Sequence, residues 1–312
     1  MKTKVIGIGD NVCDKYYPAK IMYPGGQAMN FSVYAKMLGA DAAYMGVFGR
    51  DEVADHVIRT LDELGVDHSR CRQYDGENGY AKVRLVDGDR EFIMSNKGGI
   101  VNEHPLELTK EDLDYIRTFK LIHTSCNGHL DGELHKLREA GVPISYDMSG
   151  RWNQEYYIET IGPQVDIAFA SCGDTPEEEI KKLCEALKAR GCRMTVATRG
   201  GKGSLIYDGE QYYTQKPKLV DAVDTLGAGD SFATAFLLAM LEKKDIHAAM
   251  EAGAEFAAKT CLVNGAFGLP GRINEKSHIC LNPRQAGSPA FLLVAAGILF
   301  YLTCHFECFI LE

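Results

Sequence analysis

The stretch Asp224-Thr-Leu-Gly-Ala-Gly-Asp230 most constrains what this chain can fold into. It follows a strand-like run at 218–223 and precedes an apolar, helix-like run, so it predicts a strand, a glycine turn and the start of a helix. The first N–H groups of a helix lack partners within it, and the helix dipole adds partial positive charge there. We therefore expect Gly227, Ala228 and Gly229 to bind an anion through their backbone.

Asp230 closes this turn and is itself negative, so it does not suit the role of an anion ligand. It suits a group that takes a proton from an attacking hydroxyl while the N–H groups stabilise a transferring phosphoryl. The alternative is an acidic residue that only complements the helix dipole. A short motif alone would favour that alternative, but seven residues in this order between a strand and a helix favour Asp230 as a catalytic base.

The same seven residues resemble, at every specified position, the Asp-Thr-x-Gly-Ala-Gly-Asp signature of the ribokinase-like, or PfkB, carbohydrate kinases. The resemblance extends over roughly residues 3–267. It implies ATP and Mg²⁺ as cofactors and a ribokinase-like α/β fold. In that fold a mostly parallel central sheet has helices on both faces and a small β-sheet lid. The alternation of strand and helix patterns after residue 105 independently predicts a parallel sheet covered on both sides.

The expected organisation is one kinase domain and a tail. The kinase domain is expected over 1–268, with its lid formed by about 11–24 and 72–98. The tail, 269–312, matches no part of the family pattern and stays unassigned. Its apolar segment at 291–303 is shorter than the roughly 20 residues of a membrane-spanning helix. A buried or partner-binding helix, a marginal membrane anchor and a non-native end remain alternatives for this segment, and a membrane partner is the less expected of these.

Candidate sugar ligands follow predicted strands, where open α/β sheets bind their ligands. The pair Gly25-Gly26, followed by Asn30, resembles the family's sugar-binding signature. Glycines let a polyol approach the backbone, and asparagine both donates and accepts hydrogen bonds. For the lid residues Arg90 and Asn96, exposed strand positions are an equally good interpretation. The predicted sugar ligands are Asp10, Asn11, Asp14, Gly25, Gly26, Asn30, Arg90, Asn96 and Asp147.

A second glycine loop, at 198–203, resembles the family's Thr-x-Gly-x-x-Gly loop beside the nucleotide phosphates. The predicted ATP ligands are Thr198, Gly200, Gly203, Thr225, Gly227, Gly229 and Asn264. The sequence departs from the family pattern at 171–174, where Ser-Cys-Gly-Asp stands in place of the family's Asn-x-x-Glu motif, which organises Mg²⁺. Glu178 is the candidate metal ligand that remains.

Three stretches, at 9–14, 147–152 and 169–171, resemble the fructoselysine 6-kinase branch of the family. This branch phosphorylates the 6-hydroxyl of a fructose joined to an amino acid. Aspartates in the first two stretches would suit the cationic amine of such a substrate. The nearest alternative is a ribokinase- or fructokinase-type kinase that acts on a neutral sugar.

Two other classes of function are less well supported. A non-catalytic sugar or nucleotide sensor on the same fold would not need Asp230. A NAD-dependent enzyme would need a third glycine and a helix after Gly7-x-Gly9, and the sequence offers neither.

Composition narrows the partners and the compartment. The net charge of −9 argues against a nucleic-acid partner. The ten cysteines form no CxxC pair, and the sequence begins without a basic-then-apolar signal segment, so we expect reduced thiols in the cytoplasm. Relatives in the family often pair through their lids, which makes a homodimer through the lid our hypothesis.

Overall fold

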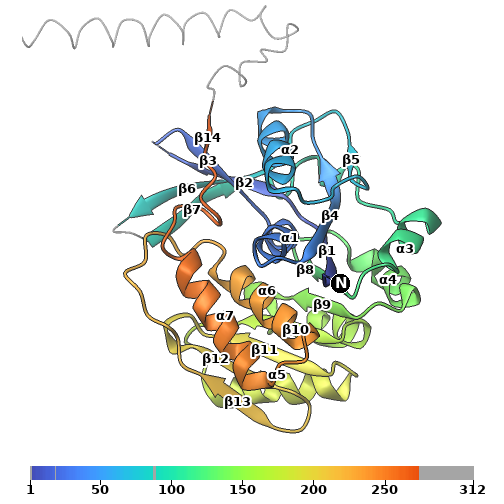
Figure 1. Cartoon of the computed structure of the whole chain (residues 1–312), viewed down its shortest axis with the longest axis vertical. Coiled ribbons are helices and arrows are strands. Elements are labelled where there is room, and N and C mark those ends of the chain that lie inside the picture. Colours follow the sequence, from blue (N-terminus) through green and yellow to red (C-terminus); the bar gives the residue numbers. More distant parts are fainter. Residues whose placement is uncertain (1, 18, 87–88, 274–312) are drawn as a thin grey trace, which may run out of the picture. The chain divides into compact units, whose positions relative to one another are not determined.

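A nine-stranded sheet forms the centre of the molecule (Figure 1). The computed structural model describes residues 2–17, 19–86 and 89–273. All neighbouring strands pair in parallel except β11–β12 and β12–β13, which are antiparallel. In spatial order the strands are β13 (Tyr212–Gln215), β12 (Ser204–Tyr207), β11 (Met194–Thr198), β10 (Ile167–Ser171), β9 (Ile144–Asp147), β8 (Leu121–Ser125), β1 (Lys4–Gly9), β4 (Asp41–Phe48) and β5 (Arg72–Gln73).

Hydrophobic residues cover both faces of this sheet, because successive side chains of a strand point to opposite sides. Val5 of β1 packs in one buried cluster, and its neighbours Ile6 and Ile8 pack in the other. The first cluster includes residues of α1 (Gln27–Met37), α6 (Ala228–Leu241) and α7 (Ile246–Thr260). The second includes residues of α3 (Lys110–Ile116), α4 (Leu134–Ala140) and α5 (Glu177–Ala189). The predicted fold class is confirmed.

A separate five-stranded sheet has the order β14-β3-β2-β6-β7. The predicted small sheet is therefore present, with one difference at its edge and one unforeseen strand. Residues 72–73 form β5, which pairs with β4 of the large sheet. The unforeseen strand is β14, which pairs with β3. The strands of this small sheet are β2 (Val12–Tyr16), β3 (Ile21–Gly25), β6 (Gly79–Val86), β7 (Asp89–Ser95) and β14 (Gly271–Arg272).

The run at 218–223 is not a strand, so this part of the prediction was wrong. The edge of the sheet at this end is β13, and the run does not add to it. Its end is bonded elsewhere, because the N–H groups of Val223 and Asp224 donate to the Cys261 carbonyl at the end of α7. The glycine turn at the start of α6 is therefore preceded by an extended loop.

The described chain contains one more helix of note, α2 (Glu52–Leu64), which is capped by the Asp51 side chain and ends at Gly65. Among the described helices, none has the length and apolar character needed to cross a bilayer. The apolar segment at 291–303 lies outside the described residues.

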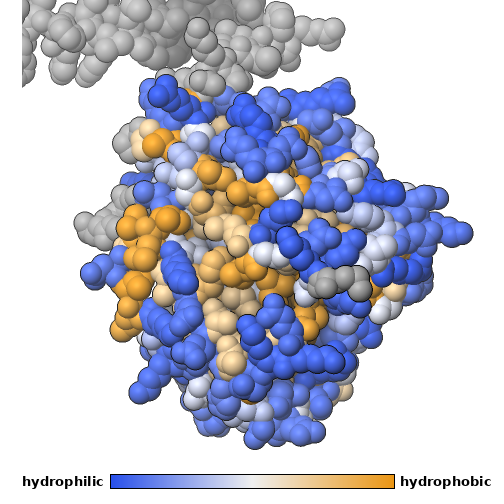
Figure 2. Space-filling model, in the orientation of Figure 1, coloured by the Kyte–Doolittle hydropathy of each residue, from blue (hydrophilic) through white to orange (hydrophobic). Residues whose placement is uncertain are grey.

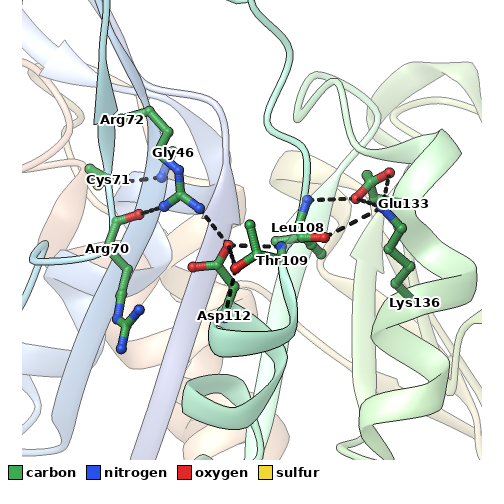
Figure 3. A network of polar contacts seen from close by, with 9 residues as sticks. All are labelled: Gly46, Arg70, Cys71, Arg72, Leu108, Thr109, Asp112, Glu133 and Lys136. Atoms are coloured by element: carbon green, nitrogen blue, oxygen red, sulfur yellow. Dashed lines mark hydrogen bonds and ion pairs between the residues drawn. The ribbon is translucent and has the colours of Figure 1, made fainter.

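A polar network fixes α3 beside the sheet (Figure 3). Asp112, which is 1% exposed, accepts a hydrogen bond from the Thr109 N–H at 3.0 Å and forms an ion pair with Arg72 of β5. On the other side of α3, the Glu133 carboxylate accepts from the Leu108 N–H at 2.7 Å. The buried carboxylate of Asp112 therefore depends on one cation from a neighbouring strand.

We predict that Arg72→Ala lowers the free energy of unfolding by about 3 kcal/mol, because it leaves the Asp112 carboxylate buried without its cation. Arg50→Ala is the control. This substitution breaks the ion pair between Arg50 and Asp75, whose side chains are 58% and 88% exposed, respectively. It should change the free energy of unfolding by at most about 0.5 kcal/mol. Chemical denaturation measures both values. Equal effects of the two substitutions would contradict the prediction.

Candidate functional site

The turn before α6 has the geometry of an anion cradle. Gly227 is in the left-handed region (φ 76°), and a side chain there would approach within 2.3 Å of the Tyr34 hydroxyl, so only glycine fits. Among the described residues, the N–H groups of Gly227 and Gly229 have no acceptor. The Ala228 N–H donates to the Thr225 carbonyl at 3.3 Å, so it is less available than the sequence suggested. The free donors are therefore those of the two glycines.

Asp224, the first residue of the motif, holds this turn in place. It is 2% exposed, and its carboxylate accepts from the N–H groups of Leu226 (2.9 Å) and Gly265 (3.0 Å). It also accepts from the Tyr16 hydroxyl of β2 at 2.6 Å. The cradle is thereby tied to the small sheet. Asp224 belongs to the motif, but its role in holding the turn was not predicted from the sequence.

Asp230 lies in the first turn of α6 and faces the first turn of α1. The Asn30 side-chain N–H donates to its carboxylate at 2.6 Å. This contact fixes the orientation of the Asn30 amide, because a carboxylate only accepts. The other polar atom of that amide, Oδ1, is buried and has no partner among the described residues. A buried acceptor without a partner is costly, so its position beside a cavity points to a ligand that donates.

Two cavities meet at the start of α6. The larger has a volume of about 700 Å³ and is lined by Asp10, Asp14, Asn30, Asp147 and Asp230 among others. The smaller has a volume of about 390 Å³ and is lined by the 198–203 loop, the extended loop before α6, and α7. Gly229 lines both. A group passing from a ligand in one cavity to a ligand in the other would therefore pass the cradle.

Several predicted sugar ligands are engaged by the protein itself. The Asp10 carboxylate accepts from the N–H groups of Gln27 (2.7 Å) and Ala28 (3.2 Å), so it serves as the cap of α1. Both side-chain N–H bonds of Asn11 go to Tyr44 and Val47. These two residues line the larger cavity, but their main contacts hold its wall together.

The lid residues also differ from expectation. The Asn96 amide accepts from the Tyr80 N–H and donates to the Asn78 carbonyl, both at 2.8 Å. It does not line the larger cavity, because both of its polar atoms are turned to the backbone. Arg90 lies in β7, and its side chain is outside the described residues. Gly26 lines the cavity, while Gly25 lies behind it, next to Asp14.

Asp147 is a buried acid in the wall of the larger cavity. Burial raises the pKa of its carboxyl to about 6. Hydrogen bonds from the Ser149 N–H, at 2.6 Å, and from Gln27 oppose the rise, and the nearby charge of Asp10 adds to it. A buried carboxyl that titrates near neutral pH in a cavity is a functional-site candidate.

The loops around this cavity carry backbone strain. Five non-glycine residues in the described chain have positive φ, and three of them line the larger cavity: Lys97 (55°), His129 (54°) and Ser149 (50°). Such conformations cost free energy and are concentrated at functional sites. Lys97 and His129 were not predicted as site residues, because their φ angles depend on loops whose partners lie far away in the chain.

The smaller cavity takes in most of the predicted nucleotide ligands: Thr198, Gly200, Gly203, Thr225 and Gly229 line it. An added Cβ at Gly200 or Gly229 would meet no protein atom within 4 Å, so the backbone there faces open space. Asn264 does not line this cavity; it is exposed in the loop after α7.

Apolar side chains surround this smaller cavity. Figure 2 shows hydrophobic side chains gathered on the face that carries α6 and α7. Leu219 and Val220, both in the cavity wall, are exposed by 78% and 40%. The apolar part of this cavity suits a flat apolar group. The exposed backbone N–H groups in another part suit a polyphosphate tail on the same ligand.

Glu178 does not fit a metal site. Its side chain is 81% exposed, lies 3.6 Å from the Lys181 ammonium and lines neither cavity. No group of three or more His, Cys, Asp or Glu side chains suited to a metal occurs among the described residues. Mg²⁺ is commonly bound by phosphates and water with few protein ligands, so this absence does not argue against a metal–nucleotide complex.

We predict that Gly229→Val abolishes any transfer between the two cavities without unfolding the protein. The new Cβ would meet no protein atom within 4 Å, and the side chain would lie at the junction of the two cavities. We expect kcat/KM to fall by about 100-fold or more, the usual loss when backbone donors to a developing charge are blocked. Gly132→Val is the control, since Gly132 is equally open and lines neither cavity. Thermal unfolding should be unchanged in both; a Gly229→Val enzyme of normal activity would contradict the prediction.

Comparisons with known proteins agree with this geometry. A family model described as pfkB family carbohydrate kinase matches residues 18–270. Fructosamine kinase FrlD of Bacillus subtilis (strain 168) is 42% identical over 266 residues, covering 85% of this chain and 93% of that protein. Fructoselysine 6-kinase of Escherichia coli (strain K12) is 31% identical over 267 residues, covering 86% of this chain and all (100%) of that protein.

Two solved structures share the fold. Ribokinase of Arabidopsis thaliana, complexed with ribose and ATP, has a TM-score of 0.72 at 21% identity and covers 85% of this chain and 94% of its own. A putative ribokinase II from E. coli, in complex with ATP and Mg²⁺, has a TM-score of 0.69 at 21% identity and covers 87% of this chain and 96% of its own.

Proposed function

Since this chain belongs to the PfkB family of carbohydrate kinases, we propose that it transfers the γ-phosphate of ATP to the 6-hydroxyl of a fructosamine, with fructoselysine as the leading substrate. The expectation of a carbohydrate kinase is confirmed by the family match. The choice of sugar rests on the names of the relatives and on the aspartates that line the larger cavity. A neutral-sugar kinase of the ribokinase or fructokinase type is the alternative.

The Asn30–Asp230 pair is the observation that carries the mechanism. A sugar hydroxyl placed between Asp230 and the cradle would donate its hydrogen to the Asp230 carboxylate. A second sugar hydroxyl would donate to the unpartnered Oδ1 of Asn30. Asn30 thus holds both the acid and the sugar, and its short contact keeps the Asp230 carboxylate in one orientation.

Transfer would then proceed at the start of α6. The hydroxyl oxygen forms a bond to the γ-phosphorus, the bond from that phosphorus to the β–γ bridging oxygen breaks, and the hydroxyl proton passes to Asp230. The N–H groups of Gly227 and Gly229 would stabilise the charge of the transferring group. The small sheet supplies Asp14, Ala81 and Ser95 to the cavity wall, and we propose that it excludes water as a lid. We propose that Mg²⁺ enters with the ATP phosphates; no step above depends on a protein ligand to it.

Sugar-dependent release of ADP from Mg-ATP tests this function. We expect turnover with fructoselysine, far less with fructose or ribose, and none without sugar. Asp230→Asn should lower kcat by about 10³-fold, because general-base catalysis contributes that much, while ATP binding is kept. Turnover on a neutral sugar alone would keep the kinase and reject the fructosamine. ATP binding with no turnover on any sugar would favour the sensor.

The buried carboxyl of Asp147 leads to a prediction about the pH dependence of KM. The pKa of Asp147 is about 6, so the carboxyl is mostly neutral at pH 5 and ionised at pH 7. Only the ionised form attracts the cationic amine of a fructosamine, so KM for fructoselysine should fall as pH rises across this range. Asp147→Asn should raise KM at pH 7 and remove the dependence. Fructose, which carries no charge, is the control substrate; an equal pH dependence for both sugars would reject Asp147 as the amine partner.

Assembly and compartment are also proposals. Ile93 and Met94 of β7, at an edge of the small sheet, are exposed by 54% and 47%, so we propose a homodimer through this sheet, which light scattering measures. The seven cysteines of the described chain are all free thiols, which supports a reducing, cytoplasmic location. Localisation of a tagged full-length chain tests this.

A further inference from the structure

The larger cavity has a second charged region opposite in sign to its acidic residues. Lys97, His129 and Arg151 all line it. They come from three loops: the connection after β7, the connection after β8, and the connection after β9. We call these three residues the basic wall.

The loops of the basic wall contact one another directly. A Cβ at Gly98, next to Lys97, would lie 3.0 Å from the His129 ring, so these two loops are packed together. Arg151 reaches the other side of the 126–129 loop, where it donates to the Cys126 carbonyl at 3.0 Å and to the Asn127 side-chain oxygen at 2.9 Å. The basic wall is therefore one continuous surface.

Its charges are not balanced by acids. Among the described residues, Lys97, His129 and Arg151 form no ion pair, although four aspartates line the same cavity. Arg151 is held by neutral oxygens, which fix its position and leave its full charge. Two of the residues, Lys97 and His129, are kept in place by strained backbone with φ of 55° and 54°. Lys97 and Arg151 are therefore unpaired cations, and the His129 imidazole adds an N–H donor beside them. On the wall of a cavity of about 700 Å³ these groups point to an anionic ligand group.

We infer that the basic wall binds the carboxylate of the amino acid joined to the sugar, so that the enzyme selects fructosyl amino acids over fructosyl amines. This rests on the proposed function. Such a substrate carries a carboxylate at the amino-acid end and a cationic amine between it and the sugar, and the larger cavity is lined by groups of the complementary charge: the basic wall for the carboxylate and Asp147 for the amine, with Asp230 for the reacting hydroxyl. A neutral hexose has no anionic group for the basic wall to bind.

The test compares two substrates that differ only in the carboxylate: fructoselysine and the fructosyl derivative of 1,5-diaminopentane. We expect the wild-type enzyme to prefer fructoselysine by at least about tenfold in kcat/KM, the value of one charge-assisted hydrogen bond. Lys97→Met should remove most of this preference by raising KM for fructoselysine, with kcat and the values for the other substrate unchanged. Lys97→Arg, which keeps the charge, should restore the preference.

Lys182→Met is the matched control, because Lys182 is an exposed lysine of α5 that lines neither cavity. It should leave both substrates unaffected. Equal kcat/KM of the wild-type enzyme for the two fructosamines, or an equal loss for both in Lys97→Met, would overturn the carboxylate site while leaving the fructosamine kinase intact. Turnover of neutral sugars alone would instead reject the proposed function. Fructose 1-phosphate, added as a third substrate, distinguishes a phosphate from a carboxylate as the anion: preference for it over both fructosamines would overturn the inference.

Discussion

The contact between Asn30 and Asp230 joins two helix starts that lie 200 residues apart in the chain, and the site depends on it. Each helix start is fixed by a further aspartate. Asp10 binds the first N–H groups of α1, and Asp224 binds the turn that leads into α6. Because α1 and α6 pack on the same face of the sheet, these two fixed ends meet at one place. The relative position of acid, amide and cradle is thus set by secondary structure and two caps, with little freedom left to side chains.

The core of the protein and the surroundings of the larger cavity differ in how well their groups are packed and paired. The core on both faces of the sheet consists of well-packed apolar residues, and the buried Asp112 has its cation. Around the larger cavity the pattern reverses: Asn30 keeps an unpartnered oxygen, burial raises the pKa of Asp147, and three residues hold positive φ. Each of these features costs free energy in the folded protein, and such features are concentrated at functional sites.

Much of the fold was predictable, since the alternation of strand and helix patterns and the glycine turns depend on local sequence. The motif at 224–230 also located the cradle and Asp230. The roles of Asn11 and Asn96 were not predictable, because their amides are bonded to strands and loops brought close only by folding. The run at 218–223 has strand-like residues, but it does not pair with the edge strand β13, and its end is bonded to the Cys261 carbonyl instead. The basic wall was not predictable either, because its three residues come from three separate loops and no single segment of the sequence contains them.

Arg151 and Asp147 both line the larger cavity, and each is held by neutral groups of the protein. Ion pairs in a cavity wall would be the expected outcome if these residues only stabilised the fold, as Arg72 and Asp112 do elsewhere. Instead, Arg151 is bonded to a carbonyl and an amide, and Asp147 to a backbone N–H and the Gln27 side chain, so each keeps its charge apart from the other. Keeping opposite charges apart within one cavity is useful only if something between them carries the complementary pair. A zwitterionic substrate does, and a neutral sugar does not.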